Sequence, residues 1–229
     1  MRYNLKCVGK AAMASFGCLM AVAGSAHGSI VYQNNFDAGG TAGWSTSTTD
    51  VTPSGRRFLG QFNNGGSALA LSGLTIGETL RLEFDFYAIN TWDGNHPLWG
   101  PDMFRVAVVG GPELLNATFA VGEVGIADGT QSYPGTESSG TFPGRFMATE
   151  NNTLGYMYLG TFARDAVWHM ILDTPVTDSA MSISFEGSGL QPIFDESWGI
   201  DTFTASLVPA PSSLAVLVGF AGIAKRRRR

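Results

Sequence analysis

Turn-forming residues divide the sequence between positions 28 and 207 into short segments and argue against a helical fold. The chain of 229 residues contains 30 glycines and 10 prolines. Turn formers recur about every ten residues, and no stretch between them shows the 3.6-residue period of an amphipathic helix. Several segments instead alternate apolar and polar residues. This spacing predicts an all-β sandwich or barrel.

The clearest predicted strand is Thr79–Ile89. Within it, Leu82, Phe84 and Phe86 point to one face, while Arg81, Glu83, Asp85 and Tyr87 point to the other. Further strands are predicted at Ile30–Phe36, Arg57–Phe62, Ala68–Leu71, Met103–Val109, Ala117–Val121, Tyr156–Phe162, Val167–Leu172, Met181–Glu186 and Ile200–Leu207. The body, Gly28–Leu207, has 23 aromatic residues among its 180 residues to fill the space between two sheets. We therefore expect one jelly-roll or concanavalin-like β-sandwich of about ten strands, with the first strand beside the last.

The N-terminal segment Met1–His27 is predicted to be a helical secretory signal peptide. Three basic residues precede an apolar run at 11–23, and small residues follow it. Both cysteines, Cys7 and Cys18, lie in this segment. The exported body therefore has no disulfide and no thiol chemistry.

The charge of the body excludes one class of partner and favours another. Gly28–Leu207 contains six arginines, no lysine and all 19 acidic residues, which gives a formal charge of −13. Nucleic-acid affinity comes from lysine and arginine that neutralise phosphates, so we expect no nucleic-acid partner. A cation is a more plausible ligand.

The C-terminal segment, residues 208–229, combines a proline motif, an apolar run and a basic end. A helix over the apolar run Ser212–Ala224 would have 13 residues. At ~1.5 Å per residue it would be about 20 Å long, which is short for a hydrocarbon core of ~30 Å. The basic end should stay in the cytoplasm and leave the body outside. We therefore expect transient membrane contact, although an ordinary tail anchor is an alternative.

This order of features resembles the PEP-CTERM sorting signal of Gram-negative bacteria, with Ala210 in place of the usual glutamate. The matching residues are Val208, Pro209, Pro211, Arg226, Arg227, Arg228 and Arg229. The resemblance implies that signal peptidase and exosortase act on the chain during export. It also implies a transient anchor in the inner membrane, a final location at the cell surface or in the extracellular matrix, and a link to exopolysaccharide and biofilm.

The body resembles carbohydrate-binding jelly-roll modules in one opening element, Phe36-Asp37 followed by Gly43-Trp44. That resemblance implies a structural calcium near the opening and the last strand. Three acids shortly before or within the predicted last strand could meet Asp37 there. The calcium candidates are therefore Asp37, Asp195, Glu196 and Asp201, and calcium is the one cofactor predicted. Alternatively, Asp195 and Glu196 form a solvated turn and Asp201 bonds to the backbone at the start of the strand.

The segment 90–102 is a candidate carbohydrate-binding loop because it combines tryptophans, carboxylates and an amide. The candidate residues are Trp92, Asp93, Asn95, Trp99 and Asp102. Tryptophan can stack on the apolar face of a sugar ring while polar side chains bond to its hydroxyls. The density of oxygen ligands also suits Ca²⁺. Alternatively, the tryptophans plug the end of the core and the aspartates cap turns.

Glu83 and Asp85 share one face of a predicted strand, about 7 Å apart at ~3.3 Å per residue. Retaining glucanases of the sandwich type use paired carboxylates on such a face, so a secreted glycoside hydrolase is an alternative function. Simple alternation also accounts for both acids, and no triad of serine, histidine and aspartate stands out. We therefore expect an exported, surface-sorted, non-enzymatic protein, structural or exopolysaccharide-binding.

Overall fold

The computed structural model describes residues 28–122, 129–136 and 141–209, and every regular element within them is a β-strand. The strands are β1 (Ser29–Asn34), β2 (Thr49–Val51), β3 (Arg57–Phe62), β4 (Gly65–Ser72), β5 (Thr79–Asn90), β6 (Met103–Val108), β7 (Glu113–Thr118), β8 (Thr130–Gln131), β9 (Phe142–Pro143), β10 (Glu150–Asn151), β11 (Met157–Tyr158), β12 (Phe162–Ala163), β13 (Asp165–Pro175), β14 (Ala180–Ser188) and β15 (Glu196–Val208). Within the described ranges, no helix is long and apolar enough to span a bilayer. The predicted signal peptide Met1–His27 and, from the sorting motif, Pro211 and Arg226–Arg229 lie outside the described residues.

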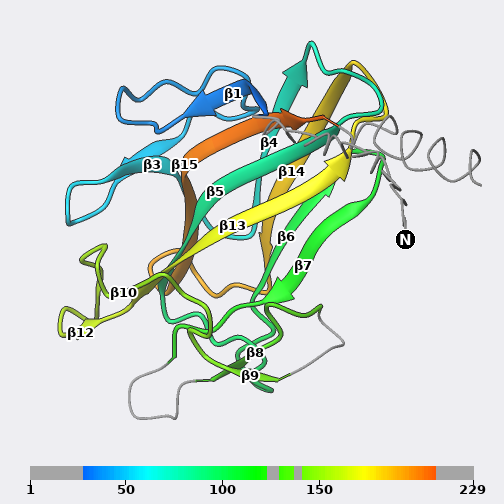
Figure 1. Ribbon diagram of the computed structural model, residues 1–229. Helices are drawn as coiled ribbons and strands as arrows, with labels where there is room; N and C mark the ends of the chain where they lie inside the picture. The colour runs from blue at the N-terminus through cyan, green and yellow to red at the C-terminus, as the bar shows by residue number, and fades with distance from the viewer. Residues whose placement is uncertain (1–27, 123–128, 137–140, 210–229) are drawn as a thin grey trace, which may run out of the picture.

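Two antiparallel sheets form the two layers of the molecule (Figure 1). The larger sheet has the order β10-β13-β5-β15-β3-β2, and β1 also pairs with β15. The smaller sheet has the order β4-β14-β6-β7, and two further pairs, β8–β9 and β11–β12, stand apart from both sheets. This architecture confirms the predicted all-β fold.

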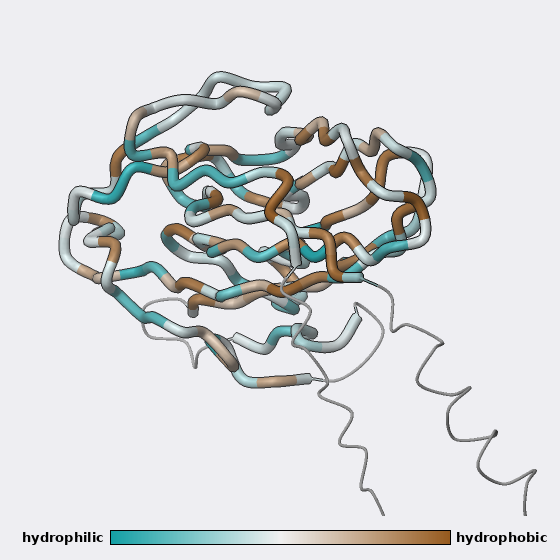
Figure 2. Tube along the Cα trace, turned by 45° about the horizontal axis from the view of Figure 1, so that its top comes forward, coloured by the Kyte–Doolittle hydropathy of each residue, from teal (hydrophilic) through white to brown (hydrophobic). Residues whose placement is uncertain are grey.

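Strand β5 lies in the larger sheet between β13 and β15, and its alternating sequence gives it an apolar inner face. Leu82, Phe84 and Phe86 are completely buried, and the ring of Phe86 stacks on Phe104 of β6 with centroids 4.0 Å apart. This contact joins the two layers, because β6 belongs to the smaller sheet. Figure 2 shows the resulting alternation of hydrophobic and hydrophilic residues along the strands. The single large core therefore lies between the sheets.

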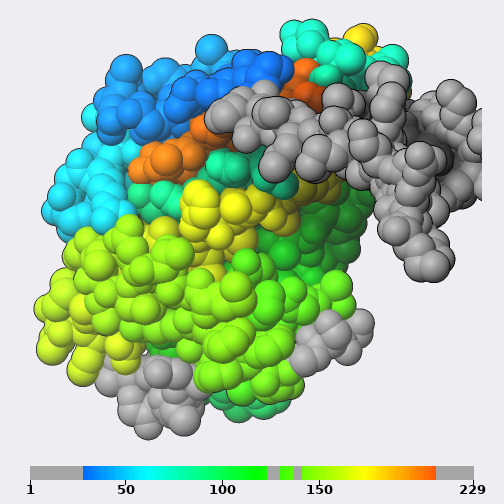
Figure 3. Space-filling model, in the orientation of Figure 1, coloured from blue at the N-terminus to red at the C-terminus, as the bar shows by residue number. Residues whose placement is uncertain are grey.

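A second, smaller core lies on the outer face of the larger sheet. Phe58, Tyr87, Leu154 and Val167 are among its buried members. Leu154 comes from the connection between β10 and β11, a region that lies over one side of the molecule beside β13 (Figure 3). The outer face of the sheet is thus covered at this place, although sequence alternation alone predicts exposure there.

The first strand lies beside the last, as predicted. β1 pairs with β15 from Ser29 opposite Leu207 to Asn34 opposite Phe203. Two predicted strands differ from those observed. The segment Ala117–Val121 is displaced, because β7 ends at Thr118 and beyond it only Ala120 forms an isolated β-bridge, with Asp93. The segment Tyr156–Phe162 is a tight turn between β11 and β12, because Leu159 and Gly160 adopt positive φ angles of 51° and 71°.

Candidate functional site

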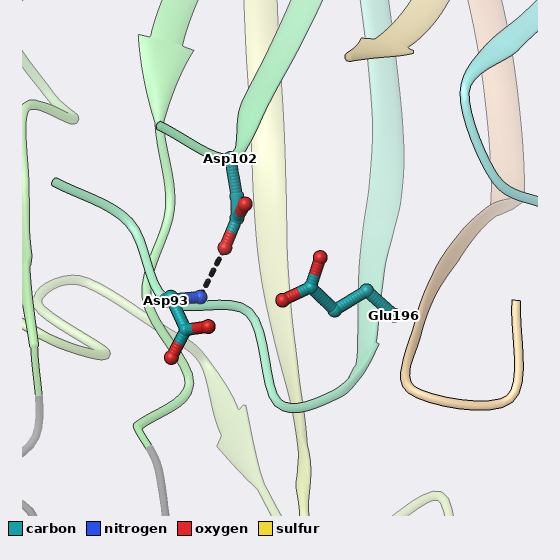
Figure 4. A group of neighbouring side chains, drawn as sticks. All are labelled: Asp93, Asp102 and Glu196. Atoms are coloured by element: carbon teal, nitrogen blue, oxygen red, sulfur yellow. Dashed lines mark hydrogen bonds between the residues drawn. The ribbon is translucent and has the colours of Figure 1, made fainter. Parts of the chain in front are cut away.

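Three buried acids meet at one end of the sandwich. Asp93 lies in the connection after β5, Asp102 directly precedes β6, and Glu196 is the first residue of β15. One carboxylate oxygen from each lies within 4.8 Å of the others. Figure 4 shows the carboxylates of Asp102 and Glu196 directed toward a common space beside Asp93. The fold thus brings Glu196 to two acids that lie about a hundred residues earlier in the chain.

Backbone hydrogen bonds hold the carboxylate of Asp102 in place. Its Oδ2 accepts hydrogen bonds from the backbone N–H groups of Asp93 and Gly94, the latter at 3.2 Å (Figure 4). In return, the N–H of Asp102 donates to the carbonyl oxygen of Gly94 at 3.0 Å. Glycine is required at position 94, because φ is +61° and a Cβ atom would collide with the carbonyl oxygen of Thr130.

The register of the larger sheet positions Glu196. It lies opposite Asn90, the last residue of β5, so its side chain starts beside the loop that contains Asp93. Its Oε2 accepts a hydrogen bond from the N–H of Gln191 at 2.6 Å. The other oxygen, Oε1, and Oδ1 of Asp102 are both buried and have no hydrogen-bond partner. Such unpaired buried oxygens are energetically costly.

Burial raises the pKa of Asp102 and the pKa of Glu196 above the ordinary values of a carboxyl group. The neighbouring negative charges act in the same direction: Asp93 on Asp102, and Asp102 on Glu196. The backbone hydrogen bonds oppose the shift in both cases. Asp195 adds further negative charge, while its own Oδ1 accepts a hydrogen bond from Oγ1 of Thr91 at 2.6 Å.

The chemistry of this cluster follows from its ligand atoms, which are all carboxylate oxygens. Such a set can hold a hard cation, or it can share protons between neighbouring carboxyl groups. Among the described residues, no arginine or histidine forms a salt bridge with Asp102 or Glu196. Their charge is therefore not cancelled by a basic side chain.

The residues proposed to bind carbohydrate do not share one exposed surface. Trp92 is completely buried, and its Nε1 donates a hydrogen bond to the carbonyl oxygen of Ser197 at 2.8 Å. This placement contradicts the prediction that Trp92 stacks on a sugar, because its ring is inaccessible. Asn95 is half-buried and accepts a hydrogen bond from Thr118. Trp99, by contrast, is 41% exposed.

The four residues predicted from the sequence to bind calcium lie in different parts of the structure. Glu196 belongs to the acidic cluster, whereas Asp201 lies farther along β15 and accepts a hydrogen bond from the hydroxyl of Tyr87 at 2.7 Å. An odd separation along a strand turns two side chains to opposite faces, so Glu196 and Asp201 cannot share one ion. Asp37 is exposed and accepts a hydrogen bond from Asn35. The four residues therefore do not form one site.

Glu83 and Asp85 lie on the outer face of the larger sheet. The Oδ1 atom of Asp85 is 2.9 Å from Nδ1 of His169 on β13. Arg81 forms a bidentate pair with Asp173 of the same neighbouring strand, with both N–O distances at 2.8 Å. The two carboxylates thus belong to a partly exposed face on which cross-strand ion pairs form.

Comparison of the chain with known protein families, with curated proteins and with solved structures gave no match. Sequence reasoning singled out Asp93, Asp102 and Glu196 but assigned them to two different sites. The sequence did indicate that the loop at 90–102 is rich in oxygen ligands that suit calcium. It did not indicate that this loop contacts the start of β15.

Proposed function

We propose that this chain is an exported, non-enzymatic β-sandwich protein of the cell surface or extracellular matrix, with a structural or exopolysaccharide-binding role. The observation that carries the proposal is the position of the two ends of the sandwich domain. Ser29 lies opposite Leu207 in the pairing of β1 with β15. The export signal and the sorting tail predicted from the sequence are therefore attached to the same end of the domain.

This arrangement gives the domain a direction relative to the membrane. Strand β15 extends from Glu196 at the acidic cluster to Val208 at the attachment end. Twelve steps of ~3.3 Å give a path of about 40 Å along the strand between these residues. A domain held through its C-terminal tail would present the acidic end, together with the loop that contains Trp99, away from the membrane.

We propose that Trp99 contacts exopolysaccharide, because it is exposed at the end of the domain that carries the acidic cluster. The imidazole ring of His96 stacks on the ring of Trp99 with centroids 4.6 Å apart, which supports the ring from one side. Leu98 is also exposed in the same loop. An exposed aromatic face supported in this way is suited to stacking on the apolar face of a sugar.

We propose that the β-sandwich has the topology of a jelly roll. Eight of the strands, β3–β7 and β13–β15, fall into the orders β13-β5-β15-β3 and β4-β14-β6-β7. Along the chain these strands alternate between the sheets, with one hairpin, β6–β7, within the smaller sheet. Two four-stranded antiparallel sheets connected in this way are typical of a jelly roll.

Export and sorting are tested by fractionating cells that produce the full chain and by mass spectrometry of its mature C-terminus. We expect the protein outside the cytoplasm, with a C-terminus that precedes Arg226. A matched chain in which Arg226–Arg229 are replaced by serine should accumulate unprocessed. Protein that stays inside the cell, or surface protein that retains all four arginines, would contradict the proposal.

Polysaccharide binding is tested on a glycan array with the full chain and with Trp99→Ala. Retention should decrease in this variant and persist in Phe162→Ala, which removes an aromatic ring of similar exposure (37%) on β12. If no glycan is retained, the structural role remains and the binding role is rejected. Hydrolysis of a β-glucan that disappears in Glu83→Gln would refute the non-enzymatic assignment.

A further inference from the structure

We propose that Asp93, Asp102 and Glu196 form a binding site for a divalent cation, and that this cation is Ca²⁺. The ion would join the β5–β6 connection to the start of β15. This inference rests on the geometry of the acidic cluster and holds whether or not the protein is exported or binds polysaccharide.

The first observation is the spacing of the oxygens. Two oxygens that bind one Ca²⁺ at ~2.3–2.6 Å can be at most about 5 Å apart. The three ligand atoms of the cluster lie within 4.8 Å of one another. The group contains no histidine or cysteine, so its chemistry suits a hard cation. Mg²⁺ usually retains several waters and takes few protein carboxylates, which fits a buried group of three acids less well.

The second observation is independent of the spacing and points to a missing partner. Asp102 and Glu196 are both 0% exposed, and each has one carboxylate oxygen without a hydrogen-bond partner. Figure 4 shows both carboxylates directed toward the space that they share with Asp93. A cation in this space would bind the unpaired oxygens and cancel the charge that burial and mutual repulsion make unfavourable.

The position of the cluster gives the ion a structural consequence. The chain passes from the larger sheet to the smaller sheet between β5 and β6, and returns to the larger sheet between β14 and β15. Asp93 and Asp102 lie in the first connection, and Glu196 ends the second. One ion bound to all three would clamp both connections at the end of the sandwich, and its binding would therefore stabilise the folded state.

The experiment uses the full-length chain in mild detergent, freed of metal with EDTA and then titrated with CaCl₂ by isothermal titration calorimetry. We expect one Ca²⁺ per chain, tighter binding of CaCl₂ than of MgCl₂, and a Tm that rises with the concentration of CaCl₂. Asp102→Asn and Glu196→Gln should each weaken binding about tenfold or more, because each removes a charged ligand. Asp178→Asn is the matched control, since this exposed acid lies in the β13–β14 connection, near the opposite end of the sandwich.

The Tm in EDTA separates loss of binding from loss of folding. Both amide variants should unfold at or above the wild-type Tm without metal, because each removes a buried carboxyl group whose ionised form is opposed by burial and by neighbouring acids. The proposal is overturned if the wild-type chain binds no Ca²⁺ at millimolar concentration, if folded variants bind it as tightly as wild type, or if Mg²⁺ binds more tightly than Ca²⁺. If the wild-type chain binds no Ca²⁺ and its Tm in EDTA falls with rising pH, the three carboxyl groups share protons instead of binding a cation.

Discussion

Replacement of Trp92 tests whether the tryptophans of the 90–102 loop belong to the core or to a binding surface. The indole of Trp92 is completely buried and meets Phe86 edge-on, with ring centroids 5.5 Å apart. Its Nε1 also satisfies the carbonyl oxygen of Ser197. Trp92→Ala would therefore leave a cavity in the core and remove this hydrogen bond.

The expected cost of Trp92→Ala is about 3–5 kcal/mol of the free energy of unfolding, the usual range for a buried aromatic residue. For a domain of this size, each kcal/mol lowers the Tm by about 2–4 °C, so the Tm should fall by roughly 6–20 °C. Trp92→Phe keeps most of the volume but loses the hydrogen bond, which contributes about 1 kcal/mol. Its effect should lie between those of wild type and Trp92→Ala.

The assay is thermal unfolding of the full chain, followed by near-ultraviolet circular dichroism. Trp99→Ala is the matched control, because this tryptophan lies in the same loop but is 41% exposed. Its cost should stay within about 0.5 kcal/mol. Equal losses of Tm in Trp92→Ala and Trp99→Ala would refute the assignment of Trp92 to the core.

Three further perturbations have outcomes that follow from the structure. In EDTA, the free energy of unfolding should fall as the pH rises above about 4, because carboxyls with a raised pKa bind protons more tightly in the folded state. Denaturation of the double variant Asp102→Asn, Glu196→Gln between pH 5 and 8 should show a smaller slope, and an unchanged slope would contradict the assignment. Gly66→Ala should unfold the protein or reduce its yield sharply in expression trials, because a Cβ atom there would overlap the carbonyl oxygen of Phe185, and normal folding would refute this packing. Arg56→Gln should cost less than about 1 kcal/mol in urea denaturation, because both partners of its ion pair are about a third exposed, and a cost of several kcal/mol would be inconsistent with that exposure.

The strands were predictable where their pattern repeats within a few residues. In β5, alternation identifies Leu82 and Phe84 as core residues, and the structure buries both completely. The same rule failed at residues 156–162, where Leu159 and Gly160 turn the chain. It also failed to predict the burial of Tyr87, because a segment from another part of the chain covers the outer face of the sheet.

Such local patterns could not predict the acidic site. Trp92 and Trp99 belong to one loop and look equivalent in the sequence, yet one is buried and the other is exposed. Likewise, Thr91 and Asp195 are 104 residues apart in the chain but share a hydrogen bond. Contacts of this kind depend on strand order and register.

The amino-acid order is therefore sufficient for two properties that do not depend on contacts between distant segments: the strand class and the large negative charge of the body. The meeting of Asp93, Asp102 and Glu196 requires the assembled sheets, because the pairing of β5 with β15 brings the third acid to the first two. The physical reason is that side-chain alternation is set by the backbone of a single strand. Burial of charge, by contrast, is set by which strands pack together.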